Sequence, residues 1–459
     1  MKVTVGNFLF FFLASKLVHS FILRDTSASS IHIPLSGGHQ VKPRSATAQA
    51  DLNAFFRSLD QTLAKYNSTE RVPRSVYGIQ KRGIDILDEG APASNLLLTD
   101  QIDNGTDVTY YGPCDVSGQT FTLIFDTGSC NLFIPGPSCT SANGCTGSIK
   151  YDGSGVDQQS QTDVIYGSGS VTGENYRDTV TCAGYPTNQQ DMIVLTNAQG
   201  FSTIDSDGLM GMGFPSICNG GQTGYFFNLI QQQPNCIQEF SFYLGRAISD
   251  TASASQMTLC GRDQSKYSGS VVQVPVSQKG YWQVALDCLV VDGTPAFFFP
   301  FFTQGQAAID TGTTIILAPS AAAAALFLTI PGSFPIPLIS GSPTLTIFGY
   351  PCQTPKKVGI RFANTNFAIN PLDFNLGELS ENVVVNLFQL LSLDVPDIIE
   401  QIFEQYTPLG GICLAAVAGD DIDPTQNLYV VGDTFLKNWY SIYNVKDSYV
   451  GFAPAVGNQ

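Results

Sequence analysis

Histidine is nearly absent from this 459-residue chain, and the few copies that occur lie at one end. His19, His32 and His39 all fall within the first forty residues, a segment that we expect to be removed. Catalysis by serine or cysteine with an imidazole base is therefore excluded for the rest of the chain. A zinc site with histidine ligands is excluded for the same reason, and no glycine-rich phosphate-binding loop is present. We expect neither a metal nor a cofactor.

Long apolar runs are missing as well. The run at residues 8–14 follows Lys2, precedes small residues near Ser20 and is too short to span a bilayer, so residues 1–20 are predicted to be a secretory signal. No later run reaches membrane-spanning length, and the last nine residues form no hydrophobic tail, so we expect no membrane or lipid anchor. Glycosylation triplets at Asn67 and Asn104 fit a secretory route. We expect an extracellular protein, with an acidic vacuole as the alternative.

Positive charge is concentrated near the N-terminus. Residues 21–82 carry nine Lys and Arg against four Asp and Glu, a net charge of +5, whereas the chain from residue 83 onward has a net charge of −23. The strong negative charge of the chain from residue 83 onward argues against nucleic acid as a partner. The basic segment ends at Lys81-Arg82, a pair that a processing protease could cut, and residues 48–66 have apolar side chains at helical spacing: Leu52, Phe55, Phe56, Leu59 and Leu63. We interpret residues 21–82 as a prosegment.

Eleven cysteines fit an oxidising compartment, and an odd number leaves at least one of them without an intramolecular partner. No CxxC pair suggests metal binding. Cys139 and Cys145 bracket a short polar loop, which makes them a candidate disulfide. Cys218–Cys236 is a further candidate.

The body has the composition of a mainly β protein. Short strands, for example residues 120–125, 170–172 and 449–452, are separated by turns rich in Gly, Asn, Asp and Ser. Helices are expected at residues 226–232, 320–328 and 383–403, the last interrupted at Pro396. The aromatic residues 297–302 are expected to form a buried strand or loop anchor. The order of elements along the chain is mostly β, and strands do not alternate with helices.

The triplet Asp-Thr-Gly occurs twice, at Asp126-Thr127-Gly128 and Asp310-Thr311-Gly312. The copies lie 184 residues apart, about one domain's length. Each follows an apolar run that is typical of a buried strand, and each precedes a hydroxyl residue. We expect two related lobes, each supplying one carboxylate to a shared site. One carboxylate could activate a water molecule while the other protonates the scissile group.

Together with other motifs in the same order, these triplets resemble the pepsin-like aspartic proteases of the secreted, fungal type. Tyr166-Gly167-Ser168 resembles the flap that closes over substrate. The segments from Asp207 to Gly211 and from Tyr429 to Asp433 resemble those that pass beneath the catalytic loops. The resemblance covers nearly the whole chain after the signal. It implies a mainly β, bilobal fold, with lobes at residues 83–247 and 248–459 and an active-site cleft between them.

The resemblance also implies roles for single residues. Asp126 and Asp310 are the expected catalytic pair, and the pair would share a proton, as in pepsin itself, because two neighbouring carboxylates do not both ionise easily. Thr127 and Thr311 are expected to exchange hydrogen bonds across the interface, Ser129 and Thr313 to bond the outer carboxylate oxygens, and Gly128 and Gly312 to permit tight turns. Lys65-Tyr66 resembles the Lys-Tyr pair with which prosegments cover the catalytic residues, and Cys352–Cys413 is the expected disulfide of the second lobe.

Three departures from the family pattern stand out. Phe133 lies where the family usually has a Trp whose ring nitrogen bonds the flap tyrosine, and Phe has no such donor. Cys130 replaces a usual Ser; we expect a buried thiol, with pairing as the alternative. Residues 380–408 are longer than usual and predict a helical surface insertion. Asp207 and Asp433 are expected to be structural.

The predicted function is therefore acid endopeptidase hydrolysis by a monomer that acts on protein or peptide substrates and is inhibited by its own prosegment. A catalytically silent pepsin-fold binding or inhibitor protein is the alternative, although such relatives usually lose an active-site residue. A secreted carbohydrate hydrolase with two carboxylates is a third possibility, which would make the flap and glycine motifs coincidental.

Overall fold

The computed structural model describes residues 49–67, 92–103, 106–145, 147, 149–166, 169–198, 205–296, 303–338, 345–354, 356–390 and 395–458. The signal segment, Lys81-Arg82, Gly167, Ser168, Asn104 and residues 297–302 lie outside these ranges, as do parts of the Asn67 glycosylation triplet. No helix within the described ranges is long and apolar enough to cross a membrane.

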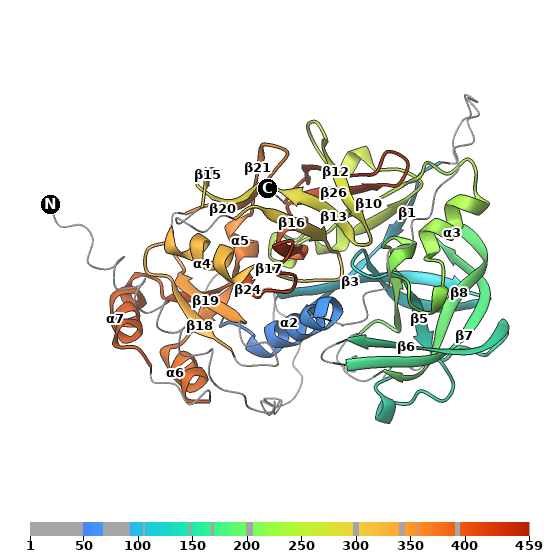
Figure 1. Cartoon of the computed structure of the whole chain (residues 1–459), viewed down its shortest axis with the longest axis horizontal. Helices are drawn as coiled ribbons and strands as arrows, with labels where there is room; N and C mark the ends of the chain where they lie inside the picture. Colours follow the sequence, from blue (N-terminus) through green and yellow to red (C-terminus); the bar gives the residue numbers. More distant parts are fainter. Residues whose placement is uncertain are drawn as a thin grey trace.

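The first lobe is built on an eight-stranded sheet. Its strands, in spatial order, are β2 (Thr99–Asp103), β3 (Thr106–Val116), β4 (Gln119–Asp126), β9 (Gly208–Gly211), β5 (Leu132–Pro135), β8 (Tyr185–Ala198), β7 (Gly169–Cys182) and β6 (Val156–Tyr166). The long β6–β7 hairpin extends from this sheet (Figure 1).

A fifteen-stranded sheet runs from the first lobe into the second. Its strands, in order, are β1 (Ser94–Leu97), β11 (Gln256–Leu259), β10 (Glu239–Tyr243), β26 (Trp439–Asn444), β27 (Tyr449–Pro454), β12 (Val272–Lys279), β13 (Trp282–Leu286), β16 (Gly305–Ile309), β25 (Leu428–Val431), β17 (Ile316–Ala318), β24 (Val417–Gly419), β19 (Thr346–Pro351), β23 (Ile412–Ala415) and β22 (Asn375–Leu379), with β18 (Phe334–Pro337) paired to β19. A four-stranded sheet contains β15 (Thr294–Pro295), β14 (Cys288–Val291), β20 (Val358–Phe362) and β21 (Thr365–Ala368). Strands β10 and β26 pair directly, so hydrogen bonds of one sheet join the two halves of the chain.

The two halves repeat one pattern of strand pairing. In the first, β4 runs parallel to β9, β9 is antiparallel to β5, and β5 is parallel to β8. In the second, β16 runs parallel to β25, β25 is antiparallel to β17, and β17 is parallel to β24. This duplication confirms the predicted mainly β fold with two related lobes.

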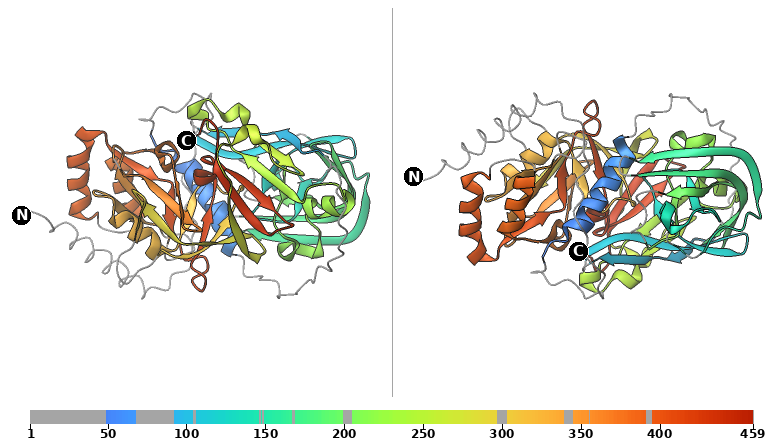
Figure 2. Two further views of the ribbon diagram at one scale, coloured as in Figure 1. Left: turned by 90° about the horizontal axis from the view of Figure 1, so that it is seen from above. Right: turned by 90° about the horizontal axis from the view of Figure 1, so that it is seen from below.

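Helices are few in the described ranges. They are α2 (Leu52–Asn67), α3 (Tyr225–Gln232), α4 (Ser320–Leu328), α5 (Pro371–Phe374), α6 (Glu381–Leu390), α7 (Asp397–Tyr406) and α8 (Asp433–Leu436). Helices α6 and α7 lie at one end of the molecule, while α2 lies near its middle (Figures 1 and 2). The predicted helices at residues 226–232 and 320–328 are confirmed. The interruption predicted within residues 383–403 is confirmed, since α6 ends at Leu390 and Pro396 is the N-cap of α7.

Helix α2 lies between the lobes. Figure 1 shows it in blue, between the part that carries β5 to β8 and the part that carries α4, α6 and β18. Its apolar side chains Phe55, Leu59 and Leu63 are buried in a cluster with side chains of the second lobe. The helical spacing in the sequence therefore identified the buried face of α2 correctly.

Ten of the eleven cysteines are paired, which leaves Cys288 without a disulfide partner. The expected bridges Cys139–Cys145 and Cys352–Cys413 are both present. The expectation of a buried thiol at Cys130 is wrong, and so is the candidate Cys218–Cys236. Their sulfurs are used in Cys130–Cys218 and Cys236–Cys260, partners that are 88 and 24 residues apart and are brought together only by the fold. The remaining bridge is Cys114–Cys182.

Candidate active site

Asp126 and Asp310 meet at the boundary between the lobes. Asp126 is the last residue of β4 and Asp310 directly follows β16, so the duplicated strand pattern presents both carboxylates at equivalent positions. Both side chains are fully buried. A Cβ atom added at Gly128 would lie 2.5 Å from the Asp310 carboxyl carbon, and one added at Gly312 would collide with Asp126. Each glycine is thus needed for the close approach of the opposite carboxylate, a reason that the sequence did not reveal.

The two catalytic loops are joined by a symmetric set of hydrogen bonds. The Thr127 amide donates to Thr311 Oγ1 at 3.1 Å, and the Thr311 amide donates to Thr127 Oγ1 at 3.0 Å. The same hydroxyls donate to the carbonyls of Ile309 and Phe125, at 2.7 and 2.6 Å. The expected exchange between the threonines is therefore present, and it fixes the separation of the loops.

The carboxylate oxygens receive bonds from their own loops. Ser129 Oγ donates to Asp126 Oδ2 at 2.6 Å, and Thr313 Oγ1 donates to Asp310 Oδ2 at 2.7 Å. The amides two residues after each aspartate donate to its Oδ1 at 2.9 Å. Such bonds favour the ionised form and orient each carboxylate.

Helix α2 places a cation between the two carboxylates. Lys65 Nζ lies 2.7 Å from Asp126 Oδ1 and 2.9 Å from Asp310 Oδ2, and its side chain is only 9% exposed. Tyr66 donates its hydroxyl to Asp310 Oδ2 at 3.0 Å and packs on the ring of Tyr281, with 4.7 Å between ring centroids. The contact expected between Lys65 and the pair is thus present, and no substrate group could occupy the same position at the same time.

Burial and Lys65 act on the two carboxylates in opposite directions. Burial raises the pKa of Asp126 to about 6, and the neighbouring Asp310 adds to this rise while Lys65 opposes it. Burial also raises the pKa of Asp310, but attraction to Lys65 and hydrogen bonds from Asp126 and Thr313 overcome that effect and lower the pKa to about 2. The pKa of Lys65 is raised because the two carboxylates outweigh the effect of its burial. With α2 in place, the pair therefore holds one proton over an acidic range of pH.

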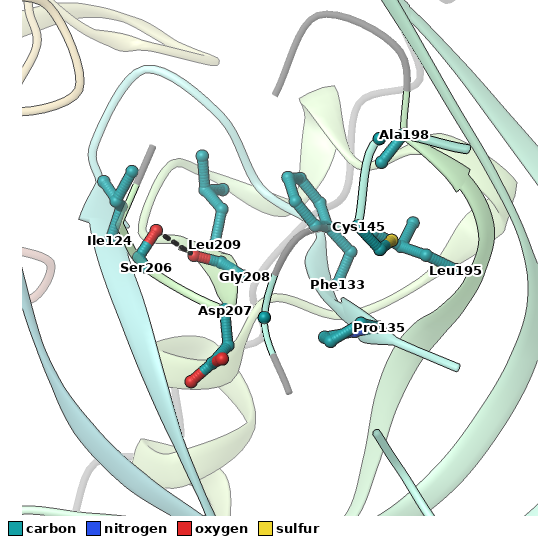
Figure 3. Close-up of a pocket in the computed structure, with 12 residues that line it drawn as sticks. Ile124, Phe133, Pro135, Cys145, Leu195, Ala198, Ser206, Asp207, Gly208 and Leu209 are labelled. Carbon is teal, nitrogen blue, oxygen red and sulfur yellow. Dashed lines mark hydrogen bonds between the residues drawn. The ribbon is translucent and has the colours of Figure 1, made fainter. Parts of the chain in front are cut away.

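The predicted flap is the β6–β7 hairpin. Tyr166 ends β6 and pairs with Gly169 at the start of β7, although the Tyr166 side chain lies outside the described part. Phe133 is buried in β5 and lines a cavity of about 30 Å³ with Ile124, Leu195 and Leu209 (Figure 3). The side chain of Phe133 therefore borders unfilled space.

The two further acidic residues of the glycine segments have different surroundings. Asp207 accepts hydrogen bonds from the Thr122 amide and hydroxyl, at 2.8 and 2.7 Å, which is a structural role. Asp433 begins α8, is fully buried, and its carboxylate has no hydrogen-bond partner within the described ranges. Burial raises the pKa of Asp433 well above its ordinary value and so favours its protonated form.

Sequence reasoning missed a buried group of charges between the lobes. Arg246 contacts both oxygens of Asp373, and Lys437 lies 2.8 Å from Asp107 and 3.1 Å from Asp373. Each of these four side chains is at most 8% exposed. Lys and Arg are scarce after residue 82, whereas acidic residues are numerous. This composition was the available signal for buried ion pairs, because each Lys or Arg there has many possible carboxylate partners.

Comparisons with known proteins agree with this geometry. The family model described as eukaryotic aspartyl protease matches residues 109–455. An aspartic protease of Phaffia rhodozyma is 32% identical over 364 residues, which cover 78% of this chain and 79% of the relative. Cathepsin E of Mus musculus is 29% identical over 91% of this chain and 92% of its own. Major aspartyl peptidase 1 of Cryptococcus neoformans is 27% identical over 83% of this chain and 77% of its own.

Proposed function

The chain belongs to the eukaryotic aspartyl protease family and is an aspartic-type endopeptidase, and we propose that it is made as a secreted zymogen that hydrolyses proteins at acidic pH. The observation that carries the proposal is the pair Asp126 and Asp310, buried together and bridged by Lys65. Five disulfides support a route through an oxidising compartment, with the cell exterior or an acidic vacuole as the destination.

The catalytic step follows from a pair of carboxylates that shares one proton. The ionised carboxylate takes a proton from water as the water oxygen attacks the scissile carbonyl carbon. The protonated carboxyl gives its proton to the carbonyl oxygen, and the leaving nitrogen is protonated as the C–N bond breaks. The reaction forms no covalent intermediate with the enzyme. Because the pair titrates as a unit, neither aspartate is assigned as the initial base.

Residues 21–82 act in this proposal as an intramolecular inhibitor. Lys65 and Tyr66 bond to the carboxylates of the catalytic pair and cover them. Arg57 of the same helix lies 3.2 Å from Asp103. The net charges of +5 and −23 on the two parts of the chain support their attraction near neutral pH. Acid weakens this attraction as carboxylates become protonated, and cleavage at or after Lys81-Arg82 would make release permanent.

The assignment of the pair is tested by Asp126→Asn and Asp310→Asn in the acid-activated protein. Each substitution should abolish cleavage of a denatured protein at pH 3–4, because each removes half of the proton transfer. A statine peptide, which mimics the transition state, should inhibit the parent enzyme. Asp292→Asn is the matched control, since Asp292 pairs with Lys356 on the exposed surface. Substantial activity in either folded active-site variant would refute the assignment, and a folded parent that neither cleaves nor binds statine would favour a catalytically silent protein.

A further inference from the structure

We propose that the Cys130–Cys218 disulfide and a chain of buried amides beside it hold the loop of Asp126 in its catalytic position. Cys130, Cys218, Asn131 and Gln222 are then positioning residues for peptide hydrolysis. This inference goes beyond the proposed zymogen and concerns the mature endopeptidase. It begins from the fact that Cys130 is separated by a single residue, Ser129, from the triplet that contains Asp126.

One side of the Asp126 loop is held by the backbone that follows β9. The amides of Met212, Gly213 and Gly211 donate to the carbonyls of Asp126, Ser129 and Asn131, at 2.8, 2.7 and 2.9 Å. A Cβ atom at Gly211 would collide with the Cys130 backbone, so the two segments are in direct contact. These bonds fix the position of the Asp126 loop relative to β9.

The disulfide holds the same loop from another direction. Cys130 is 1% exposed and Cys218 is 7% exposed, so the bond is shielded from solvent. Cys218 lies between two short 3-10 turns, Pro215–Ile217 and Asn219–Gly221. The Cys130 sulfur also lies close to Gly224, where an added Cβ would be 3.1 Å away. The bridge thus ties the catalytic loop to the segment that leads into α3.

A chain of amide side chains continues from the adjacent residue to the flap hairpin. Asn131 donates through Nδ2 to Gln222 Oε1 at 2.8 Å, and Gln222 donates through Nε2 to Asn175 Oδ1 at 2.9 Å. Asn175, on β7, donates to Ser160 Oγ of β6 at 2.9 Å. Asn131 also accepts from the Asn219 amide at 2.9 Å. The three linking amides are at most 8% exposed, so water competes little for these bonds.

The second lobe has no equivalent covalent link. Thr314 occupies the position that corresponds to Cys130, and its hydroxyl donates to the Val108 carbonyl at 2.7 Å. The disulfide and the amide chain therefore support the loop of Asp126 and not the loop of Asp310. Ser129, between the triplet and Cys130, donates to Asp126 Oδ2 at 2.6 Å, so a displaced Cys130 would displace this donor. Loss of that bond would raise the pKa of Asp126 and misplace its carboxyl for reaction.

The test is the double substitution Cys130→Ser with Cys218→Ser, assayed in the acid-activated enzyme. We expect kcat to fall about 10- to 100-fold with KM changed less than about twofold, since a displacement on the order of 1 Å can cost 100-fold in rate. The pH–kcat profile should move to higher pH. The matched control is Cys352→Ser with Cys413→Ser, because the two bridges close loops of 88 and 61 residues and should constrain the unfolded chain similarly. The control should lose thermal stability but keep kcat and the pH profile.

A second variant keeps the inference testable if the double substitution does not fold. Gln222→Ala interrupts the amide chain and leaves the disulfide intact, and kcat should fall about 3- to 10-fold with the same shift of the pH–kcat profile. Gln256→Ala is its control, because Gln256 is equally buried but bonds to Thr258 and Asp263. An unchanged kcat in a folded Cys130/Cys218 variant, or an equal loss in the control bridge, would overturn the proposal. If only Gln222→Ala folds, the proposal fails when its kcat and pH profile match those of Gln256→Ala.

Discussion

Replacing Lys65 by Met should release the latent enzyme without acid. The change is made in residues 21–459 with Lys81 and Arg82 replaced by Ala, so that processing cannot remove the prosegment. Lys65 is 9% exposed and both of its partners are fully buried. Breaking a buried ion pair by removing one partner costs about 3–5 kcal/mol, because the remaining charge stays buried without compensation. Docking of α2 should therefore weaken by about a hundred- to several-thousand-fold.

The assay is turnover of a peptide substrate at pH 6 before any exposure to acid. The parent pro-form should be nearly inactive, whereas the Lys65→Met form should approach the activity of the mature enzyme. Arg57→Met is the matched control on the same helix. Its ion pair with Asp103 has side chains 30% and 29% exposed, and exposed pairs contribute only about 0–1 kcal/mol. If Lys65→Met stays as inactive as Arg57→Met, or if the parent pro-form is fully active at pH 6, the reasoning is refuted.

The same geometry predicts the pH at which the pro-form opens. Attraction to Lys65 lowers the pKa of Asp310 in the docked form, so the stability from this contact is present above the pKa of the undocked carboxyl and is lost as pH falls toward about 2. The pair holds one proton in the docked form and gains a second as the contact with Lys65 is lost. The processing-resistant parent should become active with a midpoint between about pH 2 and pH 4, and a midpoint above pH 5 would contradict the role of the Lys65–Asp310 contact.

Three further predictions concern the mature enzyme. Phe133→Trp should lower the free-energy barrier to turnover by about the value of one neutral hydrogen bond, 0.5–1.5 kcal/mol. Tyr166→Phe should then reduce turnover by a larger factor in the Phe133→Trp background than in the parent. Equal factors would show that the two positions are not coupled. Arg246→Met should lower the free energy of unfolding in urea by about 3 kcal/mol, the lower end of the range for a broken buried ion pair, because Lys437 still lies 3.1 Å from the Asp373 carboxylate, and a loss below about 1 kcal/mol would contradict this. Non-reducing peptide mapping should find Cys288 as the free thiol, and recovery of Cys139 or Cys352 as a thiol would exclude the corresponding bridge.

Sequence alone was sufficient for features encoded by neighbouring residues. Each Asp-Thr-Gly triplet follows its own apolar strand, so the catalytic candidates and the duplicated lobes could be recognised without knowing how the strands pair. The buried face of α2 followed from helical spacing, and the Cys139–Cys145 bridge from a loop of a few residues. The position of Lys65 was predicted from resemblance to prosegments of the family rather than from any local pattern.

Only the tertiary structure decided what depends on residues far apart in the chain. The partners of Cys130 and Arg246 lie 88 and 127 residues away, and no local pattern restricts which of many possible partners the fold brings within reach. The need for glycine at position 128 comes from a carboxylate in the other lobe. The unequal pKa values of Asp126 and Asp310 have the same origin, since nearly equivalent sequences acquire different electrostatics only when burial and Lys65 act on them at distances set by the fold.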